Sequence, residues 1–306
     1  MPNYLIGLSI PEEKIIDYIP EKTKMLSNMI PGNLSTYIYD NEIDYYNEYR
    51  SSYFAITMKK HGWDCLRHYE IMANGCIPYF IDIEYCPAHS MSLLPKKLFI
   101  YGNTLYEKYK NKNIDDLTID DKNELNKLIK DILLFTKTNL TTKCITKQIL
   151  EKSNHINVNK ILVITGQEGV PDCMRGLILN GLKNMFKNNC HEYPKTSYIY
   201  KNNYDYKNMY AKGFTWTGLI ENSNDYRDDN LDNTILEDIN NKKYDIVIFG
   251  AIARGLPLYD IIAKVYKPDE IIVICGDDQH SCDHSILVRN NNNHFFTRGE
   301  TFYNFF

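Results

Sequence analysis

Residues 51–83 read "SSYFAITMKKHGWDCLRHYEIMANGCIPYFIDI", and this stretch decides the fold class. Two apolar runs in it, "SYFAITM" and "CIPYFIDI", have the β-branched and aromatic content of strands that are covered on both faces. The segment between them predicts a helix over residues 65–74, with Asp64 as its N-cap and Gly75 as the residue that ends it. A helix between two such strands indicates a parallel βαβ unit.

The same alternation of apolar runs and polar helical stretches continues along the chain. Apolar runs without strict alternation favour strands buried on both faces, and such strands are typical of parallel α/β sheets. The further runs of this kind are "YLIGLSI", "STYIYD" and "KLFIYG" in the first half, and "NKILVITG", "TSYIY", "KYDIVIFG" and "DEIIVICG" in the second.

Two α/β domains are expected, because a helical stretch separates the strand-like runs into two sets. The apolar positions of that stretch follow helical spacing, and its end is a polar connector that contains Asn and Ser. We therefore expect a first domain over residues 1–155 and a second over residues 156–306. The apolar positions of the separating helix are Leu125, Leu128, Ile129, Ile132 and Leu133.

The composition is that of a globular protein: of the 306 residues, 43% are hydrophobic and 24% are charged. A net charge of −4 argues against a protein that binds nucleic acid through bulk electrostatics. The N-terminal residues lack the pattern of a secretory signal, and no apolar run approaches the roughly 20 residues that span a bilayer. We expect a cytoplasmic protein without a membrane span, whose eight cysteines stay reduced.

The turn and helix of the opening stretch predict an anion site. Lys59 and Lys60 precede the helix, and Arg67 lies in its first turn, where a cation opposes the helix dipole unless an anion is bound. Glu70 follows three residues later on the same face and is suited to accept hydrogen bonds from the hydroxyls of a ribose. The predicted ligand is a nucleoside diphosphate, with Trp63 beside it. The alternative is an ion pair of Arg67 and Glu70 on a solvated helix face.

A known family has a similar motif. The segment "YFAITMKKHGWDCLRHYEIMANGCIPYFIDIEYCP", followed by "MSLLPKKL", resembles the donor-nucleotide half of exostosin-like glycosyltransferases, especially their viral and algal members. The shared residues are Arg67, Glu70, Ala73 and the run Gly75-Cys76-Ile77-Pro78, in that order; the run "IMANG" departs from the family pattern. The resemblance implies a GT-B architecture, in which two Rossmann-like domains face each other across a cleft. It also implies a nucleotide-sugar donor held by Arg67 and Glu70, with no obligatory metal.

The order of the two halves implies a permuted chain. In the usual GT-B arrangement the acceptor domain comes first, whereas here the donor-like motif does. The resemblance therefore implies a circular permutation, in which residues 1–155 form the donor domain with its connecting helix and residues 156–306 form the acceptor side. This layout predicts that Met1 and Phe306 lie near each other, beside the hinge between the domains.

The second half offers carboxylates for a general base, which inverting transfer of a sugar requires for the acceptor hydroxyl. Asp172 and Glu168 follow the strand-like run "NKILVITG" and are the first candidates, although Asp172 also suits a helix N-cap. Further candidates follow the run "DEIIVICG": Asp277 or Asp278, and the nearby His280.

Other residues of the second half leave alternatives open. Arg254, in "FGAIARGLP", is suited to a donor phosphate or an acceptor carboxylate, and an exposed structural role is the alternative. Trp216, in "YAKGFTWTGL", either packs in the core or stacks on an acceptor sugar. The spacing of Cys and His in "CGDDQHSCDH" matches no standard zinc arrangement, so no metal site is predicted.

The resulting functional hypothesis is a glycosyltransferase that moves a sugar from a UDP- or GDP-sugar to a glycan or another hydroxyl acceptor. We expect it to invert the anomeric centre and to need neither a metal nor another cofactor. The alternatives are a non-catalytic protein that binds nucleotide sugars or carbohydrates, and another Rossmann-type nucleotide-dependent enzyme. The absence of a G-x-G-x-x-G run around Gly166 and Gly169 argues against a dinucleotide-dependent enzyme.

Overall fold

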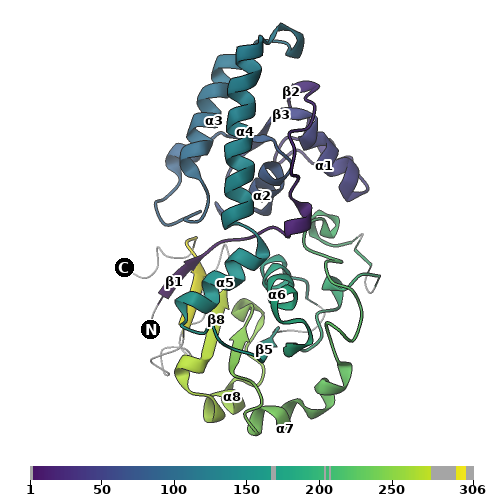
Figure 1. The fold of residues 1–306 in the computed structure, drawn as a ribbon, viewed down its shortest axis with the longest axis vertical. Helices are drawn as coiled ribbons and strands as arrows, with labels where there is room; N and C mark the ends of the chain where they lie inside the picture. The colour runs from purple at the N-terminus through teal and green to yellow at the C-terminus, as the bar shows by residue number, and fades with distance from the viewer. Residues whose placement is uncertain (1–2, 167–169, 203–204, 207, 277–293, 301–306) are drawn as a thin grey trace.

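Two parallel sheets, each packed against helices, make up the chain (Figure 1). The computed structural model describes residues 3–166, 170–202, 205–206, 208–276 and 294–300. One sheet has six strands in the order β1-β9-β8-β7-β5-β6, and the other has three in the order β2-β3-β4. The predicted α/β class with parallel sheets is therefore confirmed. The finer assignment to a GT-B arrangement stays a prediction.

The three-stranded unit spans residues 11–140 and contains the stretch that decides the fold. Pro78 lies in its edge strand β4, where the missing N–H of proline removes no hydrogen bond to a further strand. Gly75 ends α2 with a φ of +61°, as predicted. Its strands are β2 (Lys24–Leu26), β3 (Ser52–Thr57) and β4 (Ile77–Phe80), and its helices are α1 (Glu42–Arg50), α2 (Leu66–Ala73), α3 (Lys96–Tyr109) and α4 (Ile119–Asn139).

The six-stranded unit comprises residues 3–9 and 141–300, as far as they are described. Its central strands are buried throughout, as expected for strands covered on both faces. Its strands are β1 (Asn3–Ile6), β5 (Ile161–Ile164), β6 (Cys190–Tyr193), β7 (Ile246–Phe249), β8 (Ile271–Cys275) and β9 (His294–Arg298). Its helices are α5 (Thr142–Lys152), α6 (Cys173–Phe186), α7 (Ile235–Asn240) and α8 (Tyr259–Val265).

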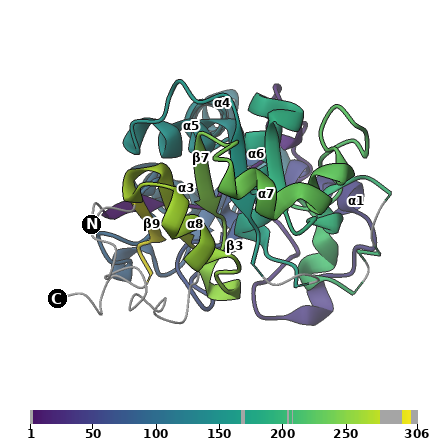
Figure 2. The ribbon, with the colours of Figure 1, turned by 90° about the horizontal axis from the view of Figure 1, so that it is seen from below.

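Alternate residues of these strands face two different helical layers. Ile161 and Val163 of β5 pack in the core cluster that contains residues of α5 and α6, whereas Leu162 and Ile164 pack in the cluster of α7 and α8. Figure 2 shows α5 and α6 on one side of β7 and α8 on the other. The sheet is thus doubly covered, which the continuous apolar runs predict.

The strand order contains a switch point beside β5. From β5 the chain goes first to β6 on one side of it and then to β7 on the other side. Loops after the two strands that flank such a point diverge and leave a crevice at the carboxyl ends of the strands. The loops after β5 and β7 are therefore where a ligand site is expected in this sheet.

Over the described residues, the chain crosses between the two units twice, at neighbouring positions. The N–H of Ile10 donates to the carbonyl of Leu140 at 3.0 Å, and the N–H of Thr142 donates to the carbonyl of Ile10 at 3.0 Å. Residues 3–6 and 142–152 consequently belong to the six-stranded unit. The expected boundary near residue 155 placed both segments in the first domain, because local pattern shows that a segment is a strand or a helix but not which sheet it joins.

The first strand lies beside the last described one. β1 pairs in parallel with β9, with Asn3 opposite Phe295 and Ile6 opposite Arg298. A permuted layout requires this adjacency, because the beginning of the chain then continues the sheet at the point where its end stops. The prediction for Met1 and Phe306 itself lies outside the described residues.

Several predicted elements differ from the structure. The run at 97–102 lies in α3 and is not a strand. The run "STYIYD" begins in the short 3-10 helix Leu34–Thr36, and "TSYIY" contains the 3-10 helix Ser197–Ile199. The N-cap of α2 is Cys65, whereas Asp64 is buried and accepts a hydrogen bond from the N–H of Leu8 at 2.9 Å. Among the described residues, no helix is both long and apolar enough to cross a membrane.

Candidate functional site

A pocket of about 510 Å³ lies at the carboxyl ends of the six-stranded sheet. Its walls come from the segments after β5 and β7, which flank the switch point, and from Gly276 and Arg298 at the ends of β8 and β9. A third wall comes from Asp205, Asn208, Met209, Tyr210 and Trp216. The volume is within the range of small-molecule sites, and the location is the one that the strand order predicts.

Asp172 and Arg254 face this pocket as a loosely held ion pair. One carboxylate oxygen of Asp172 accepts the N–H of Arg175 at 3.0 Å and caps α6, as predicted. The other accepts from Nε of Arg254 at 3.3 Å, and the two side chains are 16% and 42% exposed. An exposed pair of this kind is held weakly, so that an anionic ligand can compete for the guanidinium.

Arg298 lies at the end of β9 and links the pocket to the other unit. Its Nη1 donates to the carbonyl of Gly276 at 3.1 Å, and its Nη2 donates to the carbonyl of Asp64. Its Nε lies 3.9 Å from the carboxylate of Asp64, whose pKa is raised because it is buried, although Arg298 opposes the rise. A cation is thus fixed at the pocket by contacts to both units.

A second buried arginine positions the loop after β5. Arg175 is buried and donates to the carbonyls of Thr165 and Val170 and to the hydroxyl of Tyr198. Gly166, with a φ of +75°, packs so closely on the next loop that a Cβ there would lie 2.8 Å from the carbonyl oxygen of Arg254. The two loops of the switch point therefore support each other, and they place Asp172 and Arg254 side by side.

The carboxyl ends of the two sheets meet beside this pocket. Ser90, after β4, donates to the carbonyl of Gly299, after β9, at 3.3 Å. The carboxylate of Glu300 accepts the N–H groups of Trp63 and Asp64 at 2.8 and 2.7 Å. A carboxylate of the protein itself therefore occupies the N–H groups of the turn before α2, where the sequence predicts a ligand phosphate. The expected open phosphate site at this turn is filled in this structure.

The predicted donor-binding residues before α2 have separate roles. Lys59 and Lys60 are exposed, and Nζ of Lys60 donates to the hydroxyl of Tyr210 at 2.9 Å, which brings it to the rim of the pocket. Trp63 is 8% exposed and stacks on Phe80, so it packs in the core. Of these three residues, Lys60 is the one that the structure brings to the pocket.

Arg67 and Glu70 are already bonded within the protein. Arg67 donates from Nε to the hydroxyl of Thr57 at 3.1 Å and from Nη2 to the carbonyl of Met58 at 2.9 Å. Glu70 is 4% exposed, and its oxygens accept from Tyr45 at 2.6 Å and from Thr215 of the other unit at 2.5 Å. The expectation of a carboxylate open to a ribose is therefore wrong for this conformation, and the alternative of a solvated ion pair is also wrong.

The remaining predicted catalytic residues lie outside the described residues: Glu168, Asp277, Asp278 and His280. Comparisons with models of protein families, with curated proteins and with solved structures find no match to this chain. The exostosin-like family therefore stays a prediction. Within the described part of the chain, no group of three His, Cys, Asp or Glu side chains is placed to hold a metal ion. Cys275 is disulfide-bonded, which corrects the expectation that all cysteines stay reduced.

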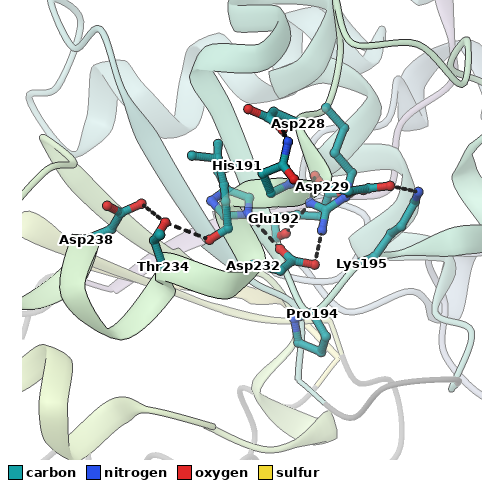
Figure 3. A network of polar contacts seen from close by, with 12 residues as sticks. His191, Glu192, Pro194, Lys195, Asp228, Asp229, Asp232, Thr234 and Asp238 are labelled. Atoms are coloured by element: carbon teal, nitrogen blue, oxygen red, sulfur yellow. Dashed lines mark hydrogen bonds and ion pairs between the residues drawn. The ribbon is translucent and has the colours of Figure 1, made fainter.

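A second polar cluster lies at the edge strand β6 (Figure 3). It contains a His-Asp pair, so we compare it with the pocket. Nε2 of His191 lies 2.9 Å from Asp232, and Nδ1 lies 2.8 Å from the hydroxyl of Tyr244. Burial lowers the pKa of His191, which favours the neutral ring. Both ring nitrogens are thus engaged, and the side chain is 2% exposed, so this cluster has a structural role.

Arg298, Glu300 and Thr215 are site residues that the sequence analysis missed. The local signal for Arg298 is that it directly follows the strand-like aromatic run "HFFT". Glu300 and Thr215 carry no local signal, because their partners lie more than 140 residues away in sequence.

Proposed function

We propose that this protein is a glycosyltransferase that moves a sugar from a UDP- or GDP-sugar to a hydroxyl group of an acceptor in the switch-point pocket. One observation carries the proposal: a carboxylate and two guanidinium groups, those of Asp172, Arg254 and Arg298, line one pocket at the carboxyl ends of a parallel sheet. Glycosyl transfer needs both kinds of group, a base for the acceptor and cations for the departing diphosphate.

The proposed roles follow from the contacts. Arg254 and Arg298 would bind the diphosphate, since guanidinium groups match phosphate oxygens in charge and geometry. A phosphate that takes over Arg254 would release one carboxylate oxygen of Asp172, which would then accept the proton of the acceptor hydroxyl. The hydroxyl oxygen would form a bond to the anomeric carbon as the bond to the diphosphate breaks. With attack from the opposite face, the anomeric centre inverts and no metal is required.

The test distinguishes the two roles of Asp172, as general base and as N-cap of α6. Asp172→Asn keeps an oxygen for the N-cap but removes the base, so we expect UDP or GDP to bind as in the wild type while turnover falls by about 10²- to 10⁴-fold. Arg254→Met should weaken nucleotide binding by about 10- to 100-fold. The assay measures the nucleoside diphosphate released from UDP- and GDP-sugars in the presence of glycan acceptors, together with calorimetric binding. Unchanged turnover in Asp172→Asn would refute the assignment of the base.

A non-catalytic protein that binds nucleotide sugars or carbohydrates is the second candidate. It is favoured by the contacts of Asp172 and Glu70, because both oxygens of each carboxylate already accept hydrogen bonds. Binding of a nucleotide sugar without release of nucleoside diphosphate would support it. A thermal-shift comparison with NAD and S-adenosylmethionine addresses the other Rossmann-type enzymes, whose cofactors should stabilise the protein less than UDP or GDP does.

A further inference from the structure

Residues 208–217, here called the bridging segment, take part in both the pocket and the contact between the units. Met209, Tyr210 and Trp216 line the pocket. Other residues of the same segment reach the three-stranded unit. Any movement of this segment therefore changes the wall of the pocket and the contact between units together.

Two lysines connect the bridging segment with the three-stranded unit. Nζ of Lys212 lies 2.6 Å from the carboxylate of Asp40 and 2.8 Å from the carbonyl of Tyr39. From the three-stranded unit, Lys60 donates to the hydroxyl of Tyr210 in the bridging segment. The side chain of Asp40 is 93% exposed, so these ion contacts are weak by themselves.

Thr215 makes the buried part of the contact. Its N–H donates to the carboxylate of Glu42 at 2.6 Å, and its hydroxyl donates to Glu70 at 2.5 Å. The hydroxyl of Tyr46 lies 2.6 Å from Oγ1 of Thr215, which can accept its proton while donating to Glu70. Thr215 has no exposed surface, Glu70 is 4% exposed, and hydrogen bonds to charged groups are stronger than those between neutral groups.

The backbone of the bridging segment adopts a conformation that these contacts must hold. Ala211, Lys212 and Thr215 have φ values of +50°, +54° and +75°, in the left-handed region that L-residues rarely adopt. Thr215 is also β-branched, which makes this region especially unfavourable. Two of the three residues, Lys212 and Thr215, are those that bond to the other unit.

We propose that the bridging segment is a latch, in which the bonds of Thr215 to Glu42 and Glu70 hold both the closed contact between the units and the wall of the pocket. Loss of these bonds frees the segment, because its backbone conformation is unfavourable without them. A ligand that fills the pocket packs against the same segment and therefore stabilises the closed state. This inference is independent of the chemistry performed in the pocket.

The test uses two threonines of the same segment. Thr215→Val removes a hydroxyl that reaches Glu70, and Thr217→Val removes one that donates to the carbonyl of Gly213 within the segment at 2.7 Å. Both changes keep the β-branched shape. Hydrogen–deuterium exchange is followed in peptides that cover residues 208–217 and α1. We expect about tenfold faster exchange of both peptides in Thr215→Val, and in Thr217→Val a change confined to residues 208–217.

A second pair of variants covers the case in which Thr215→Val does not fold. Tyr46→Phe removes the hydroxyl that contacts Thr215, and Tyr49→Phe removes one that contacts Tyr45 within the three-stranded unit at 3.2 Å. Only Tyr46→Phe should speed the exchange of residues 208–217, by several-fold. The proposal is overturned if Thr215→Val leaves α1 as protected as Thr217→Val does, or if the two tyrosine variants have equal effects on the bridging segment.

Discussion

The six-stranded unit holds two clusters of charged side chains that differ in how completely they satisfy each other. In the network that contains Glu192 of Figure 3, Lys183 and Glu192 are 2.6 Å apart and neither side chain is exposed. In the pocket, Asp172 and Arg254 are 3.3 Å apart and are 16% and 42% exposed. Oppositely charged side chains thus form a sealed structural network in one place and remain open to a ligand in the other.

One helix joins the two clusters. Asp172 caps the start of α6 at the pocket, and Lys183, near the end of the same helix, enters the sealed network. Glu192 of β6 then meets Arg227 at 3.4 Å, and Arg227 contacts Asp229 at 2.7 Å and also Asp232. We infer that the network fixes α6 on the sheet, and that this rigid helix holds Asp172 at the pocket.

The largest predicted effect comes from breaking the sealed network. Lys183→Met leaves the buried carboxylate of Glu192 without its nearest cation, so the free energy of unfolding should fall by about 3–5 kcal/mol. The matched change in the pocket, Arg254→Met, removes an exposed partner and should cost less than about 1 kcal/mol. Urea denaturation measures both. Equal losses of stability would contradict the distinction between the clusters.

His191 should make the free energy of unfolding depend more steeply on pH than it would without this residue. Burial lowers its pKa, so below the ordinary value the unfolded chain binds a proton that the folded protein does not. Stability from this residue is present above about pH 6.5 and is lost as the pH falls toward the lowered folded pKa, by at most about 1.4 kcal/mol per pH unit. His191→Gln should flatten the slope as the pH falls below about 6.5. If the slopes are the same in both proteins, the ring is not held neutral.

Replacing the helix cap should have an intermediate effect. Asp172→Ala removes the oxygen that accepts the N–H of Arg175, which should lower the free energy of unfolding by about 1 kcal/mol. Asp172→Asn keeps that bond and should be nearly as stable as the wild type, although both variants lose turnover. A stability loss of the same size in both would mean that the charge of Asp172, and not its cap, supports the fold.

The smallest change in the free energy of unfolding should come from the rim of the sealed network, where Lys195 meets Asp229. Lys195 and Asp229 are 3.0 Å apart, but 25% and 65% of their side chains are exposed. Asp229→Asn keeps an acceptor and should change the free energy of unfolding by less than about 1 kcal/mol. A loss comparable to that of Lys183→Met would show that the network is a single unit up to its surface.

The comparison also explains what local sequence patterns predict and what they miss. The runs around β5, β7 and β8 are apolar throughout, so their burial is visible in the sequence. β6 was missed because it reads "CHEY", and its His and Glu are buried only through partners elsewhere in the chain. The run at 97–102 is short and apolar, and such runs suit a buried helix as well as a strand.

The residues of the candidate site, like the strands, could be predicted only where local sequence patterns determine them. Local rules identified Asp172 as a cap and Arg254 as a residue after a strand, and the structure brings the two together. The same rules placed Arg67 and Glu70 on one helix face but gave no sign of Thr215, which bonds to Glu70 from 145 residues away. Contacts between units decide whether a carboxylate is open to a ligand, and spacing along one helix does not report them.

The most direct test of the account is a crystal structure of the protein soaked with UDP or GDP. The central claim, that the switch-point pocket is the ligand site, predicts density for the diphosphate within hydrogen-bond distance of Arg254 and Arg298, with the bridging segment closed over it. Density over the start of α2 beside Arg67, with the switch-point pocket empty at saturating nucleotide, would contradict it.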